Sequence, residues 1–386
     1  MVLHFSTIMQ PDKLVFDEQY YIPAAKSILQ GAGTDRIEHP PLAQLIIAAG
    51  IWLFGDNPLG WRFLPVVFGI IGLIFFYLIC RQLKMTRKYA YLATFLLSFE
   101  NQTFIQSSIA MLDVFSLAFM MASFWLYLKG RYITSGAMVG LAILSKLTGV
   151  LAALVIIVHW LLTDRTHWKR LFIFIVVTLA TFWILMPLLE FTIWHKWLNP
   201  LTQVRFMLDS NSLATFAHHP LDAMLSRPWD WLIRPIILTY WIDPHYLAMI
   251  SPPIWALIIP ATIFIALKSW RPNNAAIFAL TWFAGTYLVW IPVSLATERI
   301  SYIFYFYPAV GAICIALSLA FSDLDNITGR VSTRATRGCL RLIMPVYLLL
   351  CLGAFVILSP VTYWWKVPLC AVAYVVSRYY FTMEGS

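Results

Sequence analysis

The stretch LGWRFLPVVFGIIGLIFFYLIC, from Leu59 to Cys80, is apolar along almost its whole length and contains a single charged residue, Arg62. An α-helix needs about 20 such residues to cross the hydrocarbon core of a bilayer. Apolar runs recur to the end of the 386-residue chain, which is 61% hydrophobic and 12% charged, with a mean hydropathy of +0.76. Only helices and closed barrels satisfy their backbone polar groups in lipid, and these runs are too long for barrel strands. The sequence therefore predicts an all-α polytopic membrane protein.

We expect about eleven membrane-spanning helices in this chain. Their approximate ranges are 59–80, 88–100, 109–128, 132–145, 148–163, 171–190, 251–268, 275–295, 300–321, 342–358 and 363–381. The fourth and fifth are short for a full crossing.

Charge indicates how these helices are oriented, because Lys and Arg accumulate in short cytoplasmic loops. With alternate links assigned to one side, that side receives 16 of the 27 basic residues but only four of the 18 acidic residues. The basic residues are Arg81, Lys84, Arg87, Lys88, Lys129, Arg131, Arg165, Lys169, Arg170, Lys268, Arg271, Arg330, Arg334, Arg337, Arg341 and Arg378. This side is predicted to be cytoplasmic. Because the basic residues are spread over membrane-edge loops and form no basic domain, nucleic-acid binding is not expected.

The cysteines and histidines indicate neither a disulfide framework nor a metal site. All five cysteines fall in predicted spans or in a cytoplasmic link, and no CxxC or zinc-type spacing occurs. His39 and the pair His218 and His219 lack the HxxxH and HExxH spacings that would favour a metal. We expect no resident metal or other cofactor.

The remaining polar segments lie on the other side, which is predicted to be extracytoplasmic. It comprises FDEQYY (16–21), EHPP (38–41), the stretch 191–234 and the turn at Glu298 and Arg299. Two short helices are expected to lie at the interface there: one over DEQYYIPAAKSILQ, broken by Pro23 and ending before Gly31, and one over 40–55, with Pro41 in its first turn. They would form a shelf that carries Asp17 and Glu18 at the membrane surface.

We divide the chain into an N-terminal outer loop with the acidic motif (1–58), a transmembrane bundle (59–190), an extracytoplasmic loop (191–250) and a second bundle (251–386). If the N-terminal loop lies outside the cytoplasm, a membrane-spanning helix must carry it across the bilayer. The stretch MVLHFSTIMQPDKLV is too short and too interrupted to span the bilayer. We therefore expect that a first transmembrane helix precedes this chain. The alternative is that a short tail crosses unaided.

Several motifs resemble the protein O-mannosyltransferases, which use a polyprenyl-phosphate sugar and have the GT-C fold. The motifs, in order, are FDEQYYIPAAKSILQG (16–31), EHPPLAQLIIAAGIWLFGDNPLGWRFLP (38–65), QSSIAMLDVF (106–115), GLAILSKLTG (140–149), HPLDAMLSRPWDWLIRPI (219–236) and ERISYIFYFYPAV (298–310). The family often has an arginine where this chain has Ser108, and its eukaryotic members carry a soluble domain in the central outer loop. The stretch 191–233 is too short for such a domain, so the chain resembles the compact prokaryotic members.

Transfer of a sugar from a lipid phosphate to a hydroxyl needs a carboxylate that takes the proton and positive groups that stabilise the departing phosphate. The sequence alone does not show which of the two carboxylates, Asp17 or Glu18, takes the proton. The resemblance implies that Asp17 is the base and that Glu18 orients it or binds the acceptor. Candidates for the phosphate are Arg62, Lys146, Arg227, Arg234 and Arg299; each of them could instead be an interfacial side chain that reaches to the membrane surface.

Other residues are candidates for the sugar or the acceptor: His39, Asp113, His219, Trp229 and Trp231. Asp113 lies inside an apolar run, where a charge is costly and usually paired. Its alternative role is structural, through a neighbouring helix or Arg62. The two tryptophans either stack on a sugar or belong to the interfacial aromatic belt.

These observations predict an integral membrane glycosyltransferase with an extracytoplasmic active site, in a prokaryotic cell membrane. The resemblance implies transfer of mannose from polyprenyl phosphate to Ser or Thr of an exported protein by a single inverting displacement. Its expected partners are the lipid-linked donor, the protein acceptor and membrane lipids. The alternatives are a GT-C enzyme acting on a lipid or glycan, and a lipid-linked-sugar transporter.

Overall fold

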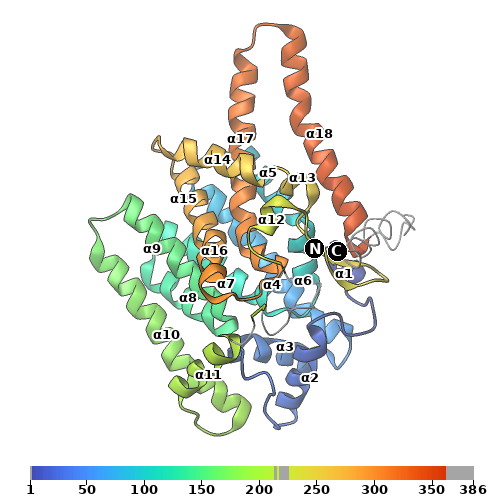
Figure 1. Ribbon diagram of the computed structural model, residues 1–386, viewed down its shortest axis with the longest axis vertical. Coiled ribbons are helices and arrows are strands. Elements are labelled where there is room, and N and C mark those ends of the chain that lie inside the picture. Colours follow the sequence, from blue (N-terminus) through green and yellow to red (C-terminus); the bar gives the residue numbers. More distant parts are fainter. Residues whose placement is uncertain (1, 213–214, 217–225, 362–386) are drawn as a thin grey trace.

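The computed structural model describes residues 2–212, 215–216 and 226–361, and these are mostly helical (Figure 1). The apolar stretch from Leu59 to Cys80 lies within α4 (Pro58–Gln82). This helix begins at Asn57, whose side chain accepts hydrogen bonds from the backbone N–H groups of Leu59 and Gly60. Its 25 residues would extend about 37 Å, which is long enough to cross a bilayer.

The described residues contain five helical segments that are long and apolar enough to span a membrane, or six if one bent pair counts as a single span. They are α4, α10 (Trp168–Trp194), α15–α16 (Asn274–Thr297), Ile303–Arg330 and α18 (Arg334–Leu358). The bent pair is α6 (Asn101–Ser108) and α7 (Leu112–Leu128), which meet at 113°. The predicted helical membrane architecture is confirmed, whereas the count of eleven spans is not.

The remaining elements complete the bundle, and they are named here with the component helices of the spans Asn274–Thr297 and Ile303–Arg330. These are α1 (Val2–Thr7), α5 (Arg87–Ser98), α8 (Tyr132–Ser145), the 3-10 turn η1 (Leu147–Val150), α9 (Leu151–Thr163), α13 (Pro252–Trp255), α14 (Ile258–Ser269), the π-helical segment η2 (Ala284–Leu288) between α15 (Asn274–Phe283) and α16 (Trp290–Thr297), the 3-10 helix η3 (Ile303–Ala309) and α17 (Val310–Arg330). The predicted span 363–381 lies outside the described residues.

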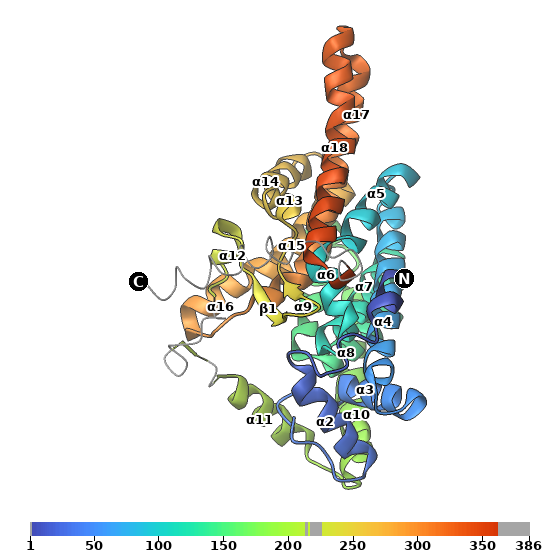
Figure 2. The same cartoon turned by 90° about the vertical axis from the view of Figure 1, so that its right-hand side faces the viewer.

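The two expected shelf helices are present as α2 (Glu18–Leu29) and α3 (Pro41–Phe54), with Pro41 as the first residue of α3. They lie together at one end of the bundle, opposite the tip of the α17–α18 hairpin (Figures 1 and 2). Pro23 does not break α2, which continues through it to Leu29. The prediction of a break was therefore wrong.

The segment between α10 and α13 holds α11 (Pro200–Ser212), α12 (Asp230–Ile233) and a two-stranded antiparallel hairpin of β1 (Leu238–Trp241) and β2 (Tyr246–Ala248). At the end opposite α2 and α3 (Figure 1), Lys88 and the Tyr89 hydroxyl contact Asp325, and Lys268 Nζ lies 2.5 Å from Asp323 Oδ2. These contacts join α5 and α14 to α17. Residues that the charge pattern assigns to the cytoplasmic side are therefore neighbours in space.

Candidate active site

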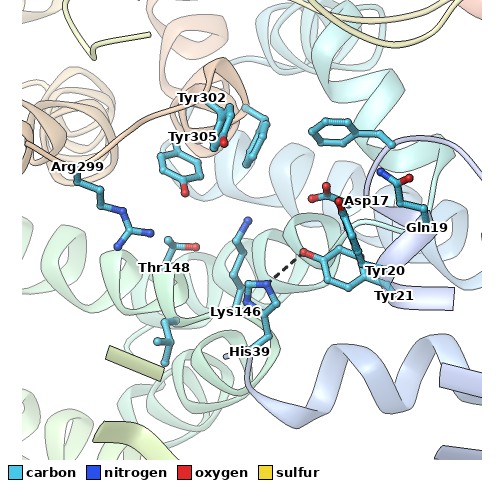
Figure 3. A pocket seen from close by; sticks show the side chains of 13 residues that line it. Asp17, Gln19, Tyr20, Tyr21, His39, Lys146, Thr148, Arg299, Tyr302 and Tyr305 are labelled. Atoms are coloured by element: carbon cyan, nitrogen blue, oxygen red, sulfur yellow. Dashed lines mark hydrogen bonds between the residues drawn. The ribbon is translucent and has the colours of Figure 1, made fainter. Parts of the chain in front are cut away.

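A cavity of about 470 Å³ lies between the shelf helices and the bundle. Its walls come from the turn before α2, from His39, from the junction of α8 and η1 around Lys146, and from the segment that runs from Arg299 to Tyr305 (Figure 3). Four of the motifs identified in the sequence therefore meet around one cavity. It is the natural candidate for the site of reaction because it combines apolar walls with a few convergent polar groups.

Asp17 enters this cavity from the start of α2. Phe16, just before it, has a φ of 49°, an uncommon left-handed conformation for a residue with a side chain, and its ring stacks on Tyr240 at 4.0 Å. Asp17 occupies the N-cap position, yet its carboxylate makes no capping hydrogen bond. The carboxylate faces the cavity instead.

The surroundings of Asp17 raise its pKa to about 6. Burial is the largest cause, because it disfavours the charged carboxylate. The positive charge of Lys146 opposes this increase, the negative charge of Asp113 adds to it, and the Tyr21 hydroxyl lowers it. A carboxylate with this pKa is ionised at neutral pH and is a stronger proton acceptor than an exposed aspartate.

Glu18, the next residue, faces away from the cavity and binds Arg62. Arg62 Nε donates to Glu18 Oε1 at 2.9 Å and Arg62 Nη2 donates to Glu18 Oε2 at 2.8 Å, and both side chains are fully buried. The backbone N–H groups of Val15 and Ala110 also donate to this carboxylate, at 2.9 and 3.0 Å. Glu18 therefore joins the acidic loop, α4 and the corner between α6 and α7, which is a structural role.

The guanidinium of Arg62 is likewise fully hydrogen-bonded. Its Nη1 donates to the carbonyls of Ile8 and Pro11, and its Nη2 donates to the carbonyl of Lys13 as well as to Glu18. With Nε on Glu18, all five N–H groups of the guanidinium are used. Neither Arg62 nor Glu18 lines the cavity, so their positions give no support to the predicted phosphate role of Arg62 or the predicted catalytic role of Glu18.

Asp113 is paired, as expected of a carboxylate within an apolar helix. Its partner is Lys146 rather than Arg62: Lys146 Nζ lies 2.8 Å from Oδ1 and 2.7 Å from Oδ2. Lys146 is held at the point where α8 ends and η1 begins, and its ammonium also lies 5.2 Å from the Phe304 ring centroid. Lys146 thereby places one cation at the wall of the cavity that Asp17 also lines (Figure 3).

Arg299 supplies a second positive charge, on the side of the cavity opposite Asp17 in Figure 3. It follows Glu298, which ends α16 in the left-handed conformation with a φ of 50°. This turn redirects the chain, and Arg299 then pairs with Thr215 in a β-bridge. Its guanidinium points into the cavity, near the hydroxyls of Thr148 and Tyr305 (Figure 3).

His39, a candidate for contact with the sugar or the acceptor, also lines the cavity. Its Nε2 lies 3.4 Å from the Tyr21 hydroxyl. Burial, with the positive charges of Lys146, Arg36 and Arg299, lowers the pKa of His39 to about 3. The imidazole is therefore neutral at the pH of the reaction and can donate or accept a hydrogen bond.

The other predicted residues lie away from the cavity lining. Trp231 is fully buried in the core and donates through Nε1 to Ser226 at 2.8 Å. Arg234 pairs with Asp230 at 3.5 Å with its side chain half exposed, and the Arg227 guanidinium packs against the Phe216 ring at 4.4 Å and the Trp229 ring at 5.4 Å. These positions give no support to a sugar role for Trp229 or Trp231, or to a phosphate role for Arg227 or Arg234. His219 lies outside the described residues.

Several lining residues were not among the predicted site residues: Phe16, Gln19, Tyr20, Tyr21, Leu147, Thr148, Tyr302, Phe304 and Tyr305. All of them fall within the quoted motifs, which was the available signal. Hydroxyl and aromatic side chains are common in membrane-edge segments, so their residue types alone do not distinguish a cavity wall from an interfacial belt.

Among the described residues, no cluster of three or more His, Cys, Asp or Glu side chains could hold a metal ion.

The sequence of this chain is similar to those of known mannosyltransferases. Residues 38–193 match the family model of dolichyl-phosphate-mannose-protein mannosyltransferases. The polyprenol-phosphate-mannose–protein mannosyltransferase of Corynebacterium glutamicum is 24% identical to this chain, over 92% of the chain and 85% of that protein.

Two solved structures have a similar fold. The Saccharomyces cerevisiae Pmt1–Pmt2 protein O-mannosyltransferase complex, bound to its sugar donor, superposes with a TM-score of 0.74 at 12% identity, covering 94% of this chain and 88% of that chain. An Archaeoglobus fulgidus oligosaccharyltransferase, in complex with Zn and sulfate, gives a TM-score of 0.53 at 15% identity, covering 92% of this chain and 52% of that chain. These matches confirm the predicted GT-C fold and the resemblance to the protein O-mannosyltransferases.

Proposed function

We propose that this chain, a membrane protein with the GT-C fold and a relative of the protein O-mannosyltransferases, transfers mannose from a polyprenyl phosphate to a protein hydroxyl. The observation that carries the proposal is the division of labour between Asp17 and Glu18. The Asp17 carboxylate faces the cavity with a pKa raised to about 6, while the Glu18 carboxylate is bound to Arg62. Among the described residues that line the cavity, Asp17 is the one carboxylate, and one direct displacement requires one base.

In the proposed reaction, the Ser or Thr hydroxyl of the acceptor gives its proton to the Asp17 carboxylate as its oxygen attacks the anomeric carbon. The bond between that carbon and the phosphate oxygen breaks, and its electron pair stays on the departing polyprenyl phosphate. Attack from the face opposite the phosphate inverts the anomeric centre. No covalent sugar–enzyme intermediate is needed, since the acceptor oxygen is itself the nucleophile.

The cations of the cavity would stabilise the charge on the departing phosphate. Arg299 presents a planar guanidinium, which suits phosphate oxygens, and Lys146 adds an ammonium held by Asp113. Preorganised positive groups that face developing negative charge are a large source of rate enhancement. Tyr302, Phe304 and Tyr305 line the same cavity and offer ring faces for the sugar.

The proposed orientation places this chemistry on the extracytoplasmic face of a prokaryotic cell membrane. It is supported by the position of the shelf helices at the end opposite the contacts of Lys88 and Lys268 with the acidic residues of α17. A donor with a polyprenyl chain could then remain in the bilayer while its head group occupies the cavity. We propose no resident cofactor, because the polar groups of the cavity supply both a base and the positive charges.

Purified protein in lipid nanodiscs, with polyprenyl-phosphate-[³H]mannose and a Thr-containing acceptor peptide, tests the proposal. Wild-type protein should give an alkali-labile, radiolabelled peptide. Asp17→Asn should reduce transfer by about 100-fold or more and still bind the donor. Transfer of mannose to a lipid or glycan, but to no peptide, would mean that the acceptor is a lipid or glycan and not a protein. Movement of the lipid-linked sugar across the bilayer without any transfer would favour a transporter.

A further inference from the structure

The hairpin formed by α17 and α18 extends beyond the rest of the bundle, at the end opposite α2 and α3 (Figures 1 and 2). We call residues 326–341, which run from the end of α17 into the first two turns of α18, the hairpin tip. The tip contains four arginines: Arg330, Arg334, Arg337 and Arg341. No acidic residue occurs in the sequence from 326 to 383. The tip therefore carries four positive charges and no negative one.

The acids closest to the tip in the sequence are bound to cations of other helices. Asp325 contacts Lys88 of α5, and Asp323 lies 2.5 Å from Lys268 of α14. Each of these carboxylates is thus already paired with a lysine. In the part of the chain that the structure describes, none of the four tip arginines forms an ion pair with an acid. The positive charge of the tip is left for a partner outside the protein.

One of the four arginines holds the turn, and the other three are exposed. Arg337 donates through Nε to the carbonyl of Val331 at 3.0 Å, which closes the turn between the two helices. Arg330, Arg334 and Arg341 are exposed. Arg334 and Arg341 are about two helical turns apart in α18, so they share one face of that helix. The closed turn thus presents three free guanidinium groups at the end of the hairpin.

The position of the arginines relative to the membrane follows from α18 itself. From Leu342 to Leu358 the helix is apolar and most of its side chains are exposed, so this part faces the hydrocarbon core. With a rise of about 1.5 Å per residue, Arg337 lies about 6 Å and Arg334 about 10 Å beyond Arg341 along the helix. The headgroup layer on each side of a bilayer is about 5–8 Å thick. The tip arginines therefore lie at the depth of the lipid phosphates or within about one Debye length of them.

We propose that the hairpin tip binds the phosphate groups of anionic phospholipids in the leaflet at this end of the bundle. The planar guanidinium matches phosphate oxygens, and clusters of four or more basic residues beside a membrane-spanning helix attract anionic lipids. A phosphatidylglycerol headgroup has a net negative charge, whereas choline neutralises the phosphate of phosphatidylcholine. The depth of the arginines favours a lipid over a soluble polyanion such as RNA. This inference does not depend on the proposed transfer reaction.

The test is lipid binding to the purified full chain in detergent, followed by native mass spectrometry. The protein is titrated with phosphatidylglycerol or phosphatidylcholine that have the same acyl chains. Wild-type protein should retain phosphatidylglycerol at a concentration about tenfold or more lower than phosphatidylcholine. The triple variant Arg330→Gln, Arg334→Gln and Arg341→Gln should lose at least about tenfold in phosphatidylglycerol affinity and bind phosphatidylcholine as before. Arg337 is kept, because it closes the turn.

The matched control removes the same charge from another exposed link. Arg165→Gln, Lys169→Gln and Arg170→Gln together neutralise the basic residues between α9 and the start of α10. This link also carries an acid, Asp164, so the control should lose less than about threefold in phosphatidylglycerol affinity. Equal losses in the two triple variants would mean that the lipid responds only to net charge, which would overturn the assignment to the tip.

Two further measurements use the wild-type protein. Its preference for phosphatidylglycerol should weaken between 50 and 500 mM ammonium acetate, because salt screens exposed charges. A preference that does not change with salt, or no preference at either concentration, would refute the proposal. A single-stranded RNA added in the absence of phosphatidylglycerol should bind no more tightly to wild type than to the tip variant. RNA binding that requires the tip arginines, without any lipid preference, would assign the tip to a soluble polyanion instead.

Discussion

Glu18 and Arg62 stand 44 positions apart in the sequence and bind each other through two parallel hydrogen bonds, within a fully buried cluster. The pair fixes the acidic loop to α4. Because Glu18 is held on this side, the preceding residue, Asp17, is turned toward the cavity. Two adjacent acids that look alike in the sequence therefore have separate roles, one in holding the loop and one in the proposed chemistry.

The first prediction concerns that pair. Arg62→Ala leaves a buried carboxylate without its counter-ion, which costs about 3–5 kcal/mol of stability. We expect a lower thermal unfolding temperature for detergent-solubilised protein and little folded material at 37 °C. Glu18→Gln should also destabilise, because its amide cannot accept both arginine hydrogen bonds. A folded Arg62→Ala protein with normal stability that had lost only polyprenyl-phosphate binding would contradict this role.

The second prediction is the pH dependence of transfer. Asp17 must be ionised to accept a proton, and its pKa is raised to about 6 by burial, with Asp113 adding to the increase and Lys146 and Tyr21 opposing it. The logarithm of kcat/KM should therefore rise with a slope of about one below pH 6 and level off above it. His39, with its pKa lowered to about 3, stays neutral over this range. A profile that is flat between pH 5 and pH 8 would exclude Asp17 as the base.

The third prediction is that the same carboxylate costs stability at neutral pH. The folded protein holds the Asp17 proton more tightly than the unfolded chain, whose pKa is near 3.8. The wild-type protein therefore loses stability from this group as the pH rises from about 4 to about 6, and the cost is complete above that window. Asp17→Asn removes the cost. Its unfolding temperature should exceed that of wild type at pH 7.5 and match it near pH 4; an equal difference at both pH values would refute the assignment.

The fourth prediction separates Arg299 from an arginine outside the cavity. Arg299→Ala should weaken binding of polyprenyl phosphate by about tenfold or more, because a charge-assisted contact to phosphate is lost. Binding can be measured as product inhibition of transfer. Arg234→Ala is the control, since Arg234 pairs with Asp230 and does not line the cavity. Equal effects of the two variants would mean that Arg299 acts only through the net charge.

The sequence predicted the membrane class, the two shelf helices and the segments that meet around the cavity, because apolar length and motif order are local properties of the chain. The partners of the charged residues could not be predicted. Arg62 lies near the start of one apolar segment and Lys146 follows another. Arg62 is nevertheless bound by the segment after α1 and by the acidic loop, while Lys146 is brought to the cavity by the end of α8. Such pairings depend on contacts between distant segments, which no local pattern encodes.

The fifth prediction concerns the corner between α3 and α4, which supports the shelf under the cavity. A Cβ atom at Gly60 would lie 2.0 Å from the carbonyl oxygen of Gly55. Gly60→Ala must therefore separate the end of α3 from the start of α4, and we expect a loss of about 1–3 kcal/mol. Gly338→Ala is the matched control, because nothing lies within 4 Å of its added Cβ. There, within α18, alanine should raise stability by about 0.5–1 kcal/mol through its higher helix propensity. Thermal unfolding of both variants in the same detergent compares the two sites.

Because the α3–α4 corner positions the shelf, Gly60→Ala should also lower transfer at temperatures where the protein remains folded. If its activity and stability both matched those of Gly338→Ala, the close contact at this corner would not hold the shelf in place.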